Sequence, residues 1–432
     1  MLKIPARNKI DEHWMLRALK LARRGQGYVE PNPMVGCVIV ADGGTGEMVG
    51  EGFHEKFGEA HAEINALKAA GEAARGATVY VTLEPCCHYG KTPPCTEALI
   101  QAGVKDVVVA MRDPFPKVAG GGIRRLREAG IPVQVGLCEE EARELNAPYL
   151  KLMEQKRPWV IAKYAMTLDG KIATRAHSSR WISSPASRAK VHQLRARVDA
   201  IMVGAATAIQ DDPMLTARCE DFASVSQDTM PEEMMLHRTM EGIFSGRLGE
   251  VLEQIPEAQT DVQSGVRRVP VRIVADAKLK IPVTSQLVKT AVEFPTLLLV
   301  GPEVSSDQME PYLACGCEIF QAKTMDRAEQ IGELLDELGR RKITNLLVEG
   351  GGGLLGVFFD LREIDEMEVF VAPKLVGGRN AITPIAGIGT AAMEHAVKLR
   401  NPQVEILDGD IHVHARVQKN DRMQDMPAPD ET

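Results

Sequence analysis

The stretch from His54 to Cys95 carries the side chains best suited to chemistry in this 432-residue chain. His61 is followed two residues later by Glu63, and then come Pro85-Cys86 and Cys95. An imidazole and two thiolates suit zinc, which prefers nitrogen and sulfur ligands in a tetrahedron. Three protein ligands leave the fourth position open for water, which is typical of a catalytic zinc rather than a structural one. Glu63 would then act as the acid/base group beside that water.

Helix and strand signals around these residues predict how they come together. Residues 61–74 read as a helix rich in Ala and Leu. His61 and Glu63 lie about 200° apart on an ideal helix, so they share a site only if His61 lies in its first turn. A strand follows over 77–85, and Thr92-Pro93-Pro94-Cys95 indicates a cap, first-turn prolines and a helix start. We expect the cysteine at that helix start to have a lowered pKa and to bind metal as a thiolate.

The pairs H-x-E and P-C together match the signature of zinc-dependent nucleobase deaminases. The second thiol follows the first by nine residues, whereas the simplest version of the signature is P-C-x-x-C. The longer motifs, H-A-E and T-L-E-P-C-x-H-x-G-K-T-P-P-C, resemble the bifunctional deaminase–reductase family of riboflavin biosynthesis. The resemblance implies zinc ligands at His61, Cys86 and Cys95 and a catalytic Glu63. Cys87 is the alternative to Cys86, although only one of two adjacent side chains points inward easily.

The resemblance also implies the residues that contact the deaminase substrate, a phosphoribosylated aminopyrimidine. Asn and Asp side chains can read the edge of such a ring, and a lysine can meet its phosphate. For His88 and Lys91, which lie in a loop between two zinc ligands, a solvated loop is the alternative interpretation. The implied contacts are Asn32, His54, His88, Lys91 and Asp113.

Composition limits the class of protein. A net charge of −8 argues against a general nucleic-acid binder, although a local basic patch stays open. The resemblance implies small-molecule substrates as the partners. The N-terminus lacks the apolar core of a signal peptide, and no apolar run approaches the ~20 residues of a membrane helix. Eight cysteines in so long a chain do not form a disulfide scaffold. We therefore expect a cytoplasmic protein with reduced thiols and no membrane partner.

The first domain is expected to span residues 1–150. Asp11 reads as a helix cap, and a buried strand around Cys37 follows, with that cysteine in the core. Strands and helices then alternate, which predicts a largely parallel sheet covered by helices. The resemblance implies an α/β protein whose N-terminal domain is cytidine-deaminase-like, with three layers, and whose C-terminal domain is dihydrofolate-reductase-like.

The second domain, expected over 158–417, resembles the family's NADPH-dependent reductase domain over most of 158–218 and 269–417. It opens with a strand that runs into an Asp-Gly turn, and a helix started by Ser and Pro follows. Arg195 and Arg218 suit a ribose phosphate, because guanidinium meets phosphate as a two-pronged fork; two surface arginines are the alternative. The residues implied at the substrate are Ser179, Arg195, Leu215, Arg218 and Glu349. Those implied at NADPH are Ala165, Trp181, Thr207, Asp211, Gly351, Gly352, Gly353, Leu354, Leu355, Gly356 and Val357.

The glycine-rich stretch 345–361 predicts a strand, a phosphate-binding loop and a helix start. Its glycines formally satisfy G-x-G-x-x-G, but we do not interpret it as a Rossmann domain. The loop comes late in its domain, and no strand-ending acid follows at about 20 residues. The preference for NADPH over NADH rests on the resemblance alone.

Several features stay open or are interpreted as ordinary. Residues 219–268 form an insertion, and three roles remain open for it: packing on the subunit, an oligomer contact, or a mobile lid. Cys315-Gly-Cys317 is interpreted as a strand start, and His412 and His414 as a pair without acidic partners nearby in sequence. Residues 418–432 read as a disordered polar tail.

Two alternative functions and the oligomeric state also remain open. One alternative is a zinc nucleoside or tRNA base deaminase with an unrelated C-terminal domain. The other is a structural zinc scaffold, in which Cys87 or His88 would supply a fourth ligand. The resemblance leaves a homo-oligomer open, since members of that family often associate. The sequence does not identify which residues would form the interface.

Overall fold

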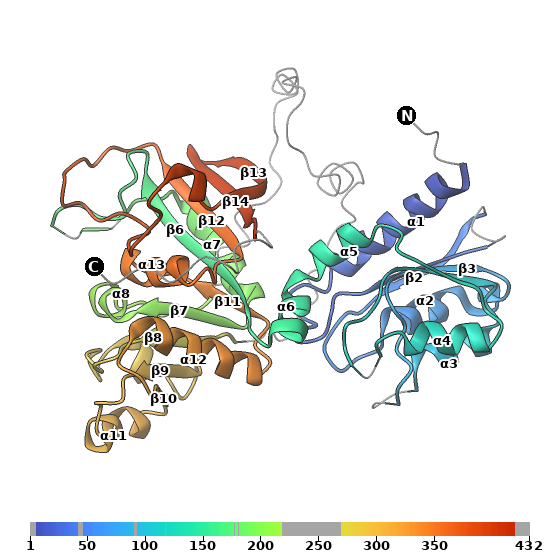
Figure 1. Ribbon diagram of the computed structural model, residues 1–432, viewed down its shortest axis with the longest axis horizontal. Helices are drawn as coiled ribbons and strands as arrows, with labels where there is room; N and C mark the ends of the chain where they lie inside the picture. The colour runs from blue at the N-terminus through green and yellow to red at the C-terminus, as the bar shows by residue number, and fades with distance from the viewer. Residues whose placement is uncertain are drawn as a thin grey trace. The chain divides into compact units, whose positions relative to one another are not determined.

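The computed structural model (Figure 1) describes residues 6–41, 46–89, 93–116, 118–176, 178–179, 181–217 and 269–419. The insertion 219–268 and residues 420–432 of the tail lie outside the described residues. The described chain forms two compact units, one of residues 6–158 with 335–344 and the other of 159–217, 269–334 and 345–419. The first unit includes the whole of helix α6 (Ala147–Gln155), whose Leu150 and Met153 pack into or against its core, and it ends at Pro158. No described helix is long and apolar enough to cross a membrane.

The first unit is built on a five-stranded sheet in the order β2-β1-β3-β4-β5. Only part of it is parallel, whereas the sequence predicted a largely parallel sheet: β1 pairs antiparallel with β2 and β3, and β3, β4 and β5 run parallel. The connection between β1 and β2 is too short for a crossover helix, so these strands form a hairpin. The strands are β1 (Gly36–Val40), β2 (Met48–Phe53), β3 (Thr78–Leu83), β4 (Asp106–Met111) and β5 (Val133–Val135).

Helices cover both faces of this sheet, which gives three layers (Figure 1). Alternate residues of β1 face opposite layers: Cys37 and Ile39 pack with α2, α3 and α4, and Val38 and Val40 pack with α1 and α5. Cys37 is fully buried, as expected for a core cysteine. The helices are α1 (Ala6–Arg23), α2 (Ala62–Ala70), the 3-10 helix η2 (Gly71–Ala74), α3 (Cys95–Ala102), α4 (Gly121–Glu128) and α5 (Glu139–Leu145).

The prediction that Asp11 caps a helix is wrong. Asp11 lies within α1, buried, and its Oδ1 accepts a hydrogen bond from the Tyr80 hydroxyl at 2.7 Å. The residue type is typical of a cap, but here the carboxylate satisfies a buried phenol on β3 instead.

The second unit contains a nine-stranded sheet in the order β10-β9-β8-β7-β11-β6-β12-β14-β13. Strands from β10 to β12 run parallel, and β14 and β13 add an antiparallel edge. The strands are β6 (Trp159–Thr167), β7 (Ala200–Gly204), β8 (Val271–Ala275), β9 (Thr296–Val300), β10 (Glu318–Gln321), β11 (Asn345–Val348), β12 (Glu366–Ala372), β13 (Leu399–Leu407) and β14 (Asp410–Val417). The helical segments are α7 (Pro185–Arg197), α8 (Ala205–Asp211), α10 (Gln286–Lys289), α11 (Ser306–Ala314), α12 (Arg327–Arg340), α13 (Gly352–Asp360) and η5 (Met393–His395).

Local signals in this unit form the elements that the sequence indicated. Ser184 caps α7 by accepting a hydrogen bond from Ser187 N–H, and Pro185 is its first residue. Cys317 directly precedes β10, as expected for a strand start. The glycine loop follows β11, a late strand, whereas the Rossmann fingerprint follows the first strand of its fold. The unit is therefore not a Rossmann domain.

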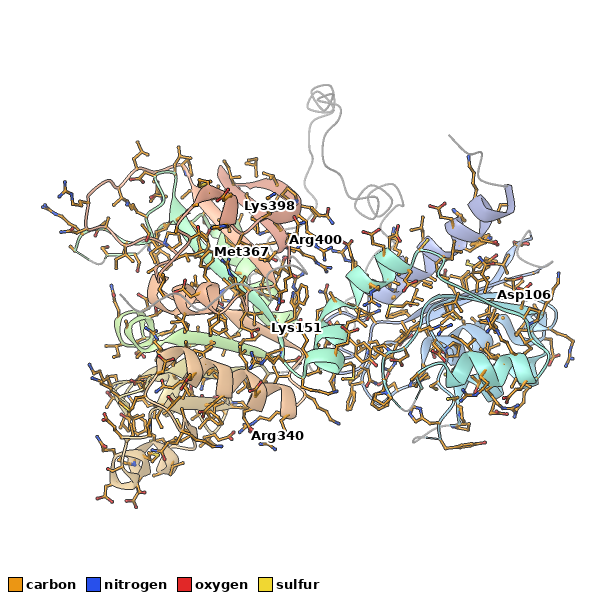
Figure 2. The ribbon with its side chains drawn as sticks, in the orientation of Figure 1. Asp106, Lys151, Arg340, Met367, Lys398 and Arg400 are labelled. Carbon is orange, nitrogen blue, oxygen red and sulfur yellow. The ribbon has the colours of Figure 1, made fainter. Side chains whose placement is uncertain are left out.

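His412 and His414 do have acidic partners, which the fold brings from β12 and β13. His412 Nε2 lies 2.6 Å from Glu368 Oε2, and its Nδ1 lies 2.7 Å from Glu405 Oε1. His414 Nδ1 lies 3.2 Å from Glu368 and 3.6 Å from Glu366. Glu366 and Glu368 are on β12, on either side of Met367, which Figure 2 labels. The pairing of β14 with β12 and with β13 places these side chains together. Glu368 is 44 residues from His412, whereas Glu405 is only seven residues away and was overlooked in the sequence.

This cluster predicts a pH-dependent stability. Burial alone would raise the pKa of Glu368, but hydrogen bonds from His412 and His414 lower it to about 2. The ionised Glu368 therefore stabilises the fold above about pH 4.5, and this stabilisation is lost progressively as the pH falls below that value. Burial would lower the pKa of His414, but Glu368 and Glu366 raise it. The protonated His414 therefore stabilises the fold below about pH 6.5, and this stabilisation is lost as the pH rises above that value. Stabilisation is largest between these limits. In urea unfolding, His414→Gln should cost more free energy at pH 5.5 than at pH 8.5, and an equal cost at both would contradict the prediction.

Candidate active sites in the two units

The predicted zinc ligands of the first unit lie together. His61 Nδ1 is 3.6 Å from Cys86 Sγ and 3.3 Å from Cys95 Sγ. A tetrahedral zinc with bonds of ~2.1 Å to nitrogen and ~2.3 Å to sulfur separates such ligands by about 3.6 Å. Within the residues that the structure describes, this group has three members, and Cys87 is not one of them. The donor set and its spacing therefore fit zinc with one position left open.

Three elements deliver these ligands. His61 is the N-cap of α2, just before the first turn, so it and Glu63 reach one site as the geometry required. Cys86 follows β3, and Cys95 is the first residue of α3. Pro94 is the N-cap of α3, so the prolines precede the helix rather than occupy its first turn. The turns that end β3 and begin α2 and α3 thus meet at one end of the sheet.

The helix start at α3 favours the thiolate of Cys86 rather than that of Cys95. The backbone N–H of Cys95 donates to Cys86 Sγ at 3.3 Å. Hydrogen bonds from Cys95 and His61 lower the pKa of Cys86 to about 4, and donation to Cys86 raises the pKa of Cys95. The lowered pKa that the sequence predicted for Cys95 is found at Cys86 instead, because the N–H of Cys95 at the helix start donates to Cys86 Sγ. Binding of metal by the Cys95 thiolate remains a prediction.

Glu63 lies beside the ligands with the properties of an acid/base group. Its side chain is buried, only 3% exposed. Burial raises the pKa of Glu63 to about 7, against the opposing effect of His61. A carboxylate with a pKa near neutrality can both accept and donate a proton.

Asn32 and His54 form one side of the candidate pyrimidine site. His54 Nδ1 lies 3.0 Å from the carbonyl oxygen of Ala60, so Nδ1–H donates there and Nε2 remains an acceptor. Asn32 Nδ2 donates to that Nε2 at 3.3 Å. Burial lowers the pKa of His54, which favours this neutral form. The ring of His54 also meets the ring of His61 edge to face, with centroids 5.4 Å apart, so this pair lies next to a zinc ligand.

The remaining deaminase candidates are placed unequally. Asp113 is buried, and its Oδ1 accepts hydrogen bonds from Tyr149 OH and Phe115 N–H. The His88 ring packs edge to face on Phe115, and its buried Nδ1 has no hydrogen-bond partner within the described chain. Lys91 lies outside the described residues.

Glu84, two residues before Cys86, is a buried carboxylate beside the candidate site that sequence reasoning missed. Its carboxylate is buried and accepts N–H groups from Gly120, Gly122 and Ile123 at 2.9–3.1 Å. These contacts fasten the start of α4 to the end of β3, next to the Cys86 segment. A carboxylate directly after a buried strand was the signal that could have identified it.

The second site lies at the carboxyl ends of β7, β11 and β6, three neighbouring parallel strands. Glu349 follows β11, and Arg195 from α7 binds it through two hydrogen bonds of 2.6 and 2.9 Å. Lys163 of β6 lies 3.9 Å from the same carboxylate. Burial would raise the pKa of Glu349, but Arg195 and Lys163 lower it to about 2. Lys163 was missed, although a lysine inside the apolar strand WVIAKYAM was the available signal.

The Arg195 fork is engaged by Glu349, so it is not free to clamp a phosphate in this arrangement. Ser179 and Asp211 do lie together, with Oγ donating to Oδ1 at 3.5 Å. Leu215 is buried with a left-handed φ of 52°, a conformation that costs free energy for a residue with a side chain. Arg218 lies outside the described residues.

Two of the candidate cofactor residues, Gly351 and Thr207, lie together at the start of α13. Gly351 is the N-cap of this helix, and a Cβ built on it would lie 3.5 Å from Thr207 Oγ1. Gly353 is exposed, with the guanidinium of Arg327 nearby. Ala165 lies on β6, and the exposed Trp181 stacks under Arg188. A helix start can bind an anion through its N–H groups, which is the role considered for Gly351 and Gly353.

Two glycines of the loop, Gly352 and Gly356, pack against other parts of the chain and are not available to a cofactor. A Cβ on Gly352 would lie 2.3 Å from Thr383 O, and one on Gly356 would lie 2.5 Å from Ala386. These two glycines therefore permit chain packing. Leu354 and Leu355 are buried in the unit, and Val357 is partly buried. Among the residues proposed from 351 to 357, Gly353 is exposed, and Gly351 and Val357 are partly exposed.

Two family models match the chain. The RibD C-terminal domain matches residues 158–413, and the cytidine and deoxycytidylate deaminase zinc-binding region matches residues 8–111. The first match alone spans more than half of the chain. This chain belongs to the RibD family.

Individual members support the assignment over nearly the whole length. Riboflavin biosynthesis protein RibD of Actinobacillus pleuropneumoniae is 40% identical over 403 residues, covering 93% of this chain and 94% of the relative. A structure of Acinetobacter baumannii RibD has a TM-score of 0.73 at 34% identity, covering 95% of this chain and 100% of that chain. A Thermotoga maritima diaminohydroxyphosphoribosylaminopyrimidine deaminase/5-amino-6-(5-phosphoribosylamino)uracil reductase has the same TM-score at 31% identity, covering 95% and 99%.

Membership confirms the predicted resemblance and the α/β fold class with its deaminase-like and reductase domains. It also confirms a bifunctional deaminase and reductase of riboflavin biosynthesis. A nucleoside or tRNA deaminase with an unrelated C-terminal domain is not favoured, because the C-terminal half matches the RibD domain. The roles of individual residues remain predictions.

Proposed function

We propose that this RibD family member deaminates 2,5-diamino-6-(5-phosphoribosylamino)pyrimidin-4-one with zinc and then reduces the ribosyl group to a ribityl chain with NADPH. The observation that carries the proposal is the cluster of His61, Cys86 and Cys95 at tetrahedral spacing, with the buried Glu63 beside it. The pairing of this unit with a RibD reductase domain in one chain supports the second step.

In the deaminase step, Glu63 moves protons. Zinc, when bound, lowers the pKa of a water molecule toward ~7. Glu63 accepts one proton from the attacking water and delivers it to the ring nitrogen. It then accepts the second proton, from the hydroxyl newly attached to the ring carbon, and delivers it to the leaving amine, which departs as ammonia. Asn32 and Asp113 read the pyrimidine edge, with His54 fixing the amide of Asn32. His88 and Lys91 are proposed to contact the phosphoribosyl side.

In the reductase step, NADPH supplies the hydride that is transferred to C1′ of the sugar. The N–H groups at Gly351 and the start of α13 are proposed to bind the cofactor phosphates, with Thr207 beside them. Glu349, Arg195 and Lys163 form a charged centre at the substrate. Because Glu349 occupies the Arg195 fork, the phosphate role falls mainly on Arg218 in this proposal.

The proposal includes a reducing, cytoplasmic setting, because ligand thiolates must stay reduced and no disulfide joins the described cysteines. Small molecules are the proposed partners. Self-association of the chain remains a prediction.

The test supplies the zinc-loaded protein with the diaminopyrimidinone substrate and follows ammonia release and NADPH absorbance separately. We expect ammonia release without NADPH, and NADPH oxidation only after deamination or with the deaminated substrate. NADH in place of NADPH should be oxidised more slowly at equal concentration. Deamination of cytidine or adenosine but not of the phosphoribosyl substrate would contradict the proposal.

A further inference from the structure

Tyr149 is a buried side chain with no part in the proton transfers proposed above, yet its hydroxyl ends at a candidate substrate residue. It lies on α6, beyond residues 8–111 that the deaminase zinc-binding model matches. Only 7% of the residue is exposed, and its hydroxyl donates to Asp113 Oδ1 at 2.8 Å. A buried phenol needs a partner, but it does not need a carboxylate at a substrate site.

The hydrogen bonds of Asp113 are unequal between its two oxygens. Oδ1 accepts both Tyr149 OH and the N–H of Phe115, at 2.8 and 2.9 Å. No hydrogen bond from the described part of the chain reaches Oδ2. Two donors on one oxygen fix the rotation of the carboxylate and leave the second oxygen for a donor on a ligand.

The junction between α5 and α6 also holds the chain segment next to Asn32, the other residue proposed to read the pyrimidine. Asn146, at the junction of α5 and α6, is 1% exposed. Its Oδ1 accepts Met34 N–H at 2.8 Å, and its Nδ2 donates to Met34 O at 2.9 Å. Met34 is two residues from Asn32, so one segment outside the matched deaminase region touches both sides of the candidate site.

We propose that Tyr149 is a positioning residue for the deaminase, which holds Asp113 so that Oδ2 faces an N–H donor of the aminopyrimidine. The inference rests on the proposed role of Asp113 in binding substrate. Tyr149 acts through Asp113 and does not itself touch the substrate. Because the contact binds the substrate equally before and in the transition state, its loss raises KM and leaves kcat unchanged.

Tyr149→Phe removes one hydroxyl and keeps the ring. We expect KM for the diaminopyrimidinone substrate to rise about 10-fold, as for a hydrogen bond to a charged group, with kcat within about 2-fold and zinc content unchanged. Tyr80→Phe is the matched control, because it removes the buried Tyr80–Asp11 hydrogen bond of the same unit. The control should lower stability and leave KM unchanged. Equal KM values for Tyr149→Phe and wild type would overturn the inference.

Asp113→Ala, alone and combined with Tyr149→Phe, separates this inference from the proposed function. With Asp113 absent, Tyr149→Phe should have no further effect on KM. If Asp113→Ala leaves KM unchanged, the assignment of Asp113 to the substrate fails. If Asp113→Ala raises KM but the Tyr149 effect persists in its background, the positioning role fails and the proposed function stands. Should Asp113→Ala not fold, the comparison of Tyr149→Phe with Tyr80→Phe decides alone.

Discussion

Glu63→Gln should abolish ammonia release while the protein keeps about one zinc per chain. Glutamine matches glutamate in size and can still hydrogen-bond, but it cannot accept the proton of the attacking water. A positioned acid/base group contributes ~10²–10⁴-fold, and one carboxylate here serves several proton transfers, so we expect a loss toward the upper end. Glu63 is buried beside the ligands but is not one of them, so zinc should remain bound. Ammonia release and metal content are measured on the same preparation.

The reductase reaction serves as the internal control for this variant. Given the already deaminated aminouracil substrate, Glu63→Gln should oxidise NADPH at the wild-type rate, because the reductase residues lie in the other unit. Glu72→Gln, an exposed glutamate on η2 just beyond α2, is the matched substitution and should leave both reactions unchanged. Deamination near the wild-type rate would show that Glu63 is not the acid/base group. Loss of zinc would instead make Glu63 a structural residue of the metal site.

The zinc site could be predicted from the sequence because its information is local. His61, Cys86 and Cys95 each lie at the end or start of an element whose own signal is strong, and turns next to sheet ends are where such side chains gather. The same holds for the Ser-Pro start of α7 and for the glycine loop after β11. The capping signal at Asp11 was weak. Its side chain lies within α1 and accepts a hydrogen bond from Tyr80 on β3, so it does not cap the helix.

Contacts between distant segments could not be predicted. Glu349 and Arg195 are 154 residues apart, and Asp113 and Tyr149 are 36 apart, so neither pair leaves a pattern in the sequence. His412 was dismissed for want of a nearby acid, although Glu368 faces it across two paired strands. Sequence periodicity predicts which face of a strand is buried, whereas register and strand order determine which side chains meet on that face.

The second large effect is expected at Glu349, the shared partner of Arg195 and Lys163. Glu349→Gln keeps the shape of the side chain but leaves two cations in a largely buried position without their carboxylate. Removing one partner of a buried ion pair costs about 3–5 kcal/mol. If that cost weakens the arrangement that binds the substrate, kcat/KM of the reductase should drop by about 10²- to 4 × 10³-fold, because each 1.4 kcal/mol is a factor of ten. Ammonia release should remain at the wild-type rate, because the deaminase lies in the first unit.

Glu51→Gln provides the matched control. Glu51 accepts the same two-pronged contact from Arg17, at 2.9 Å for each hydrogen bond, but both side chains are about a third exposed. Solvent screens that pair, so its loss should cost about 1 kcal/mol or less and leave the reductase unchanged. A Glu349→Gln enzyme that reduces the aminouracil substrate within a few-fold of wild type would show that the buried charge centre is structural. In that case the substrate contact must be sought among Ser179, Leu215 and Arg218, and the first of these already lies against Asp211.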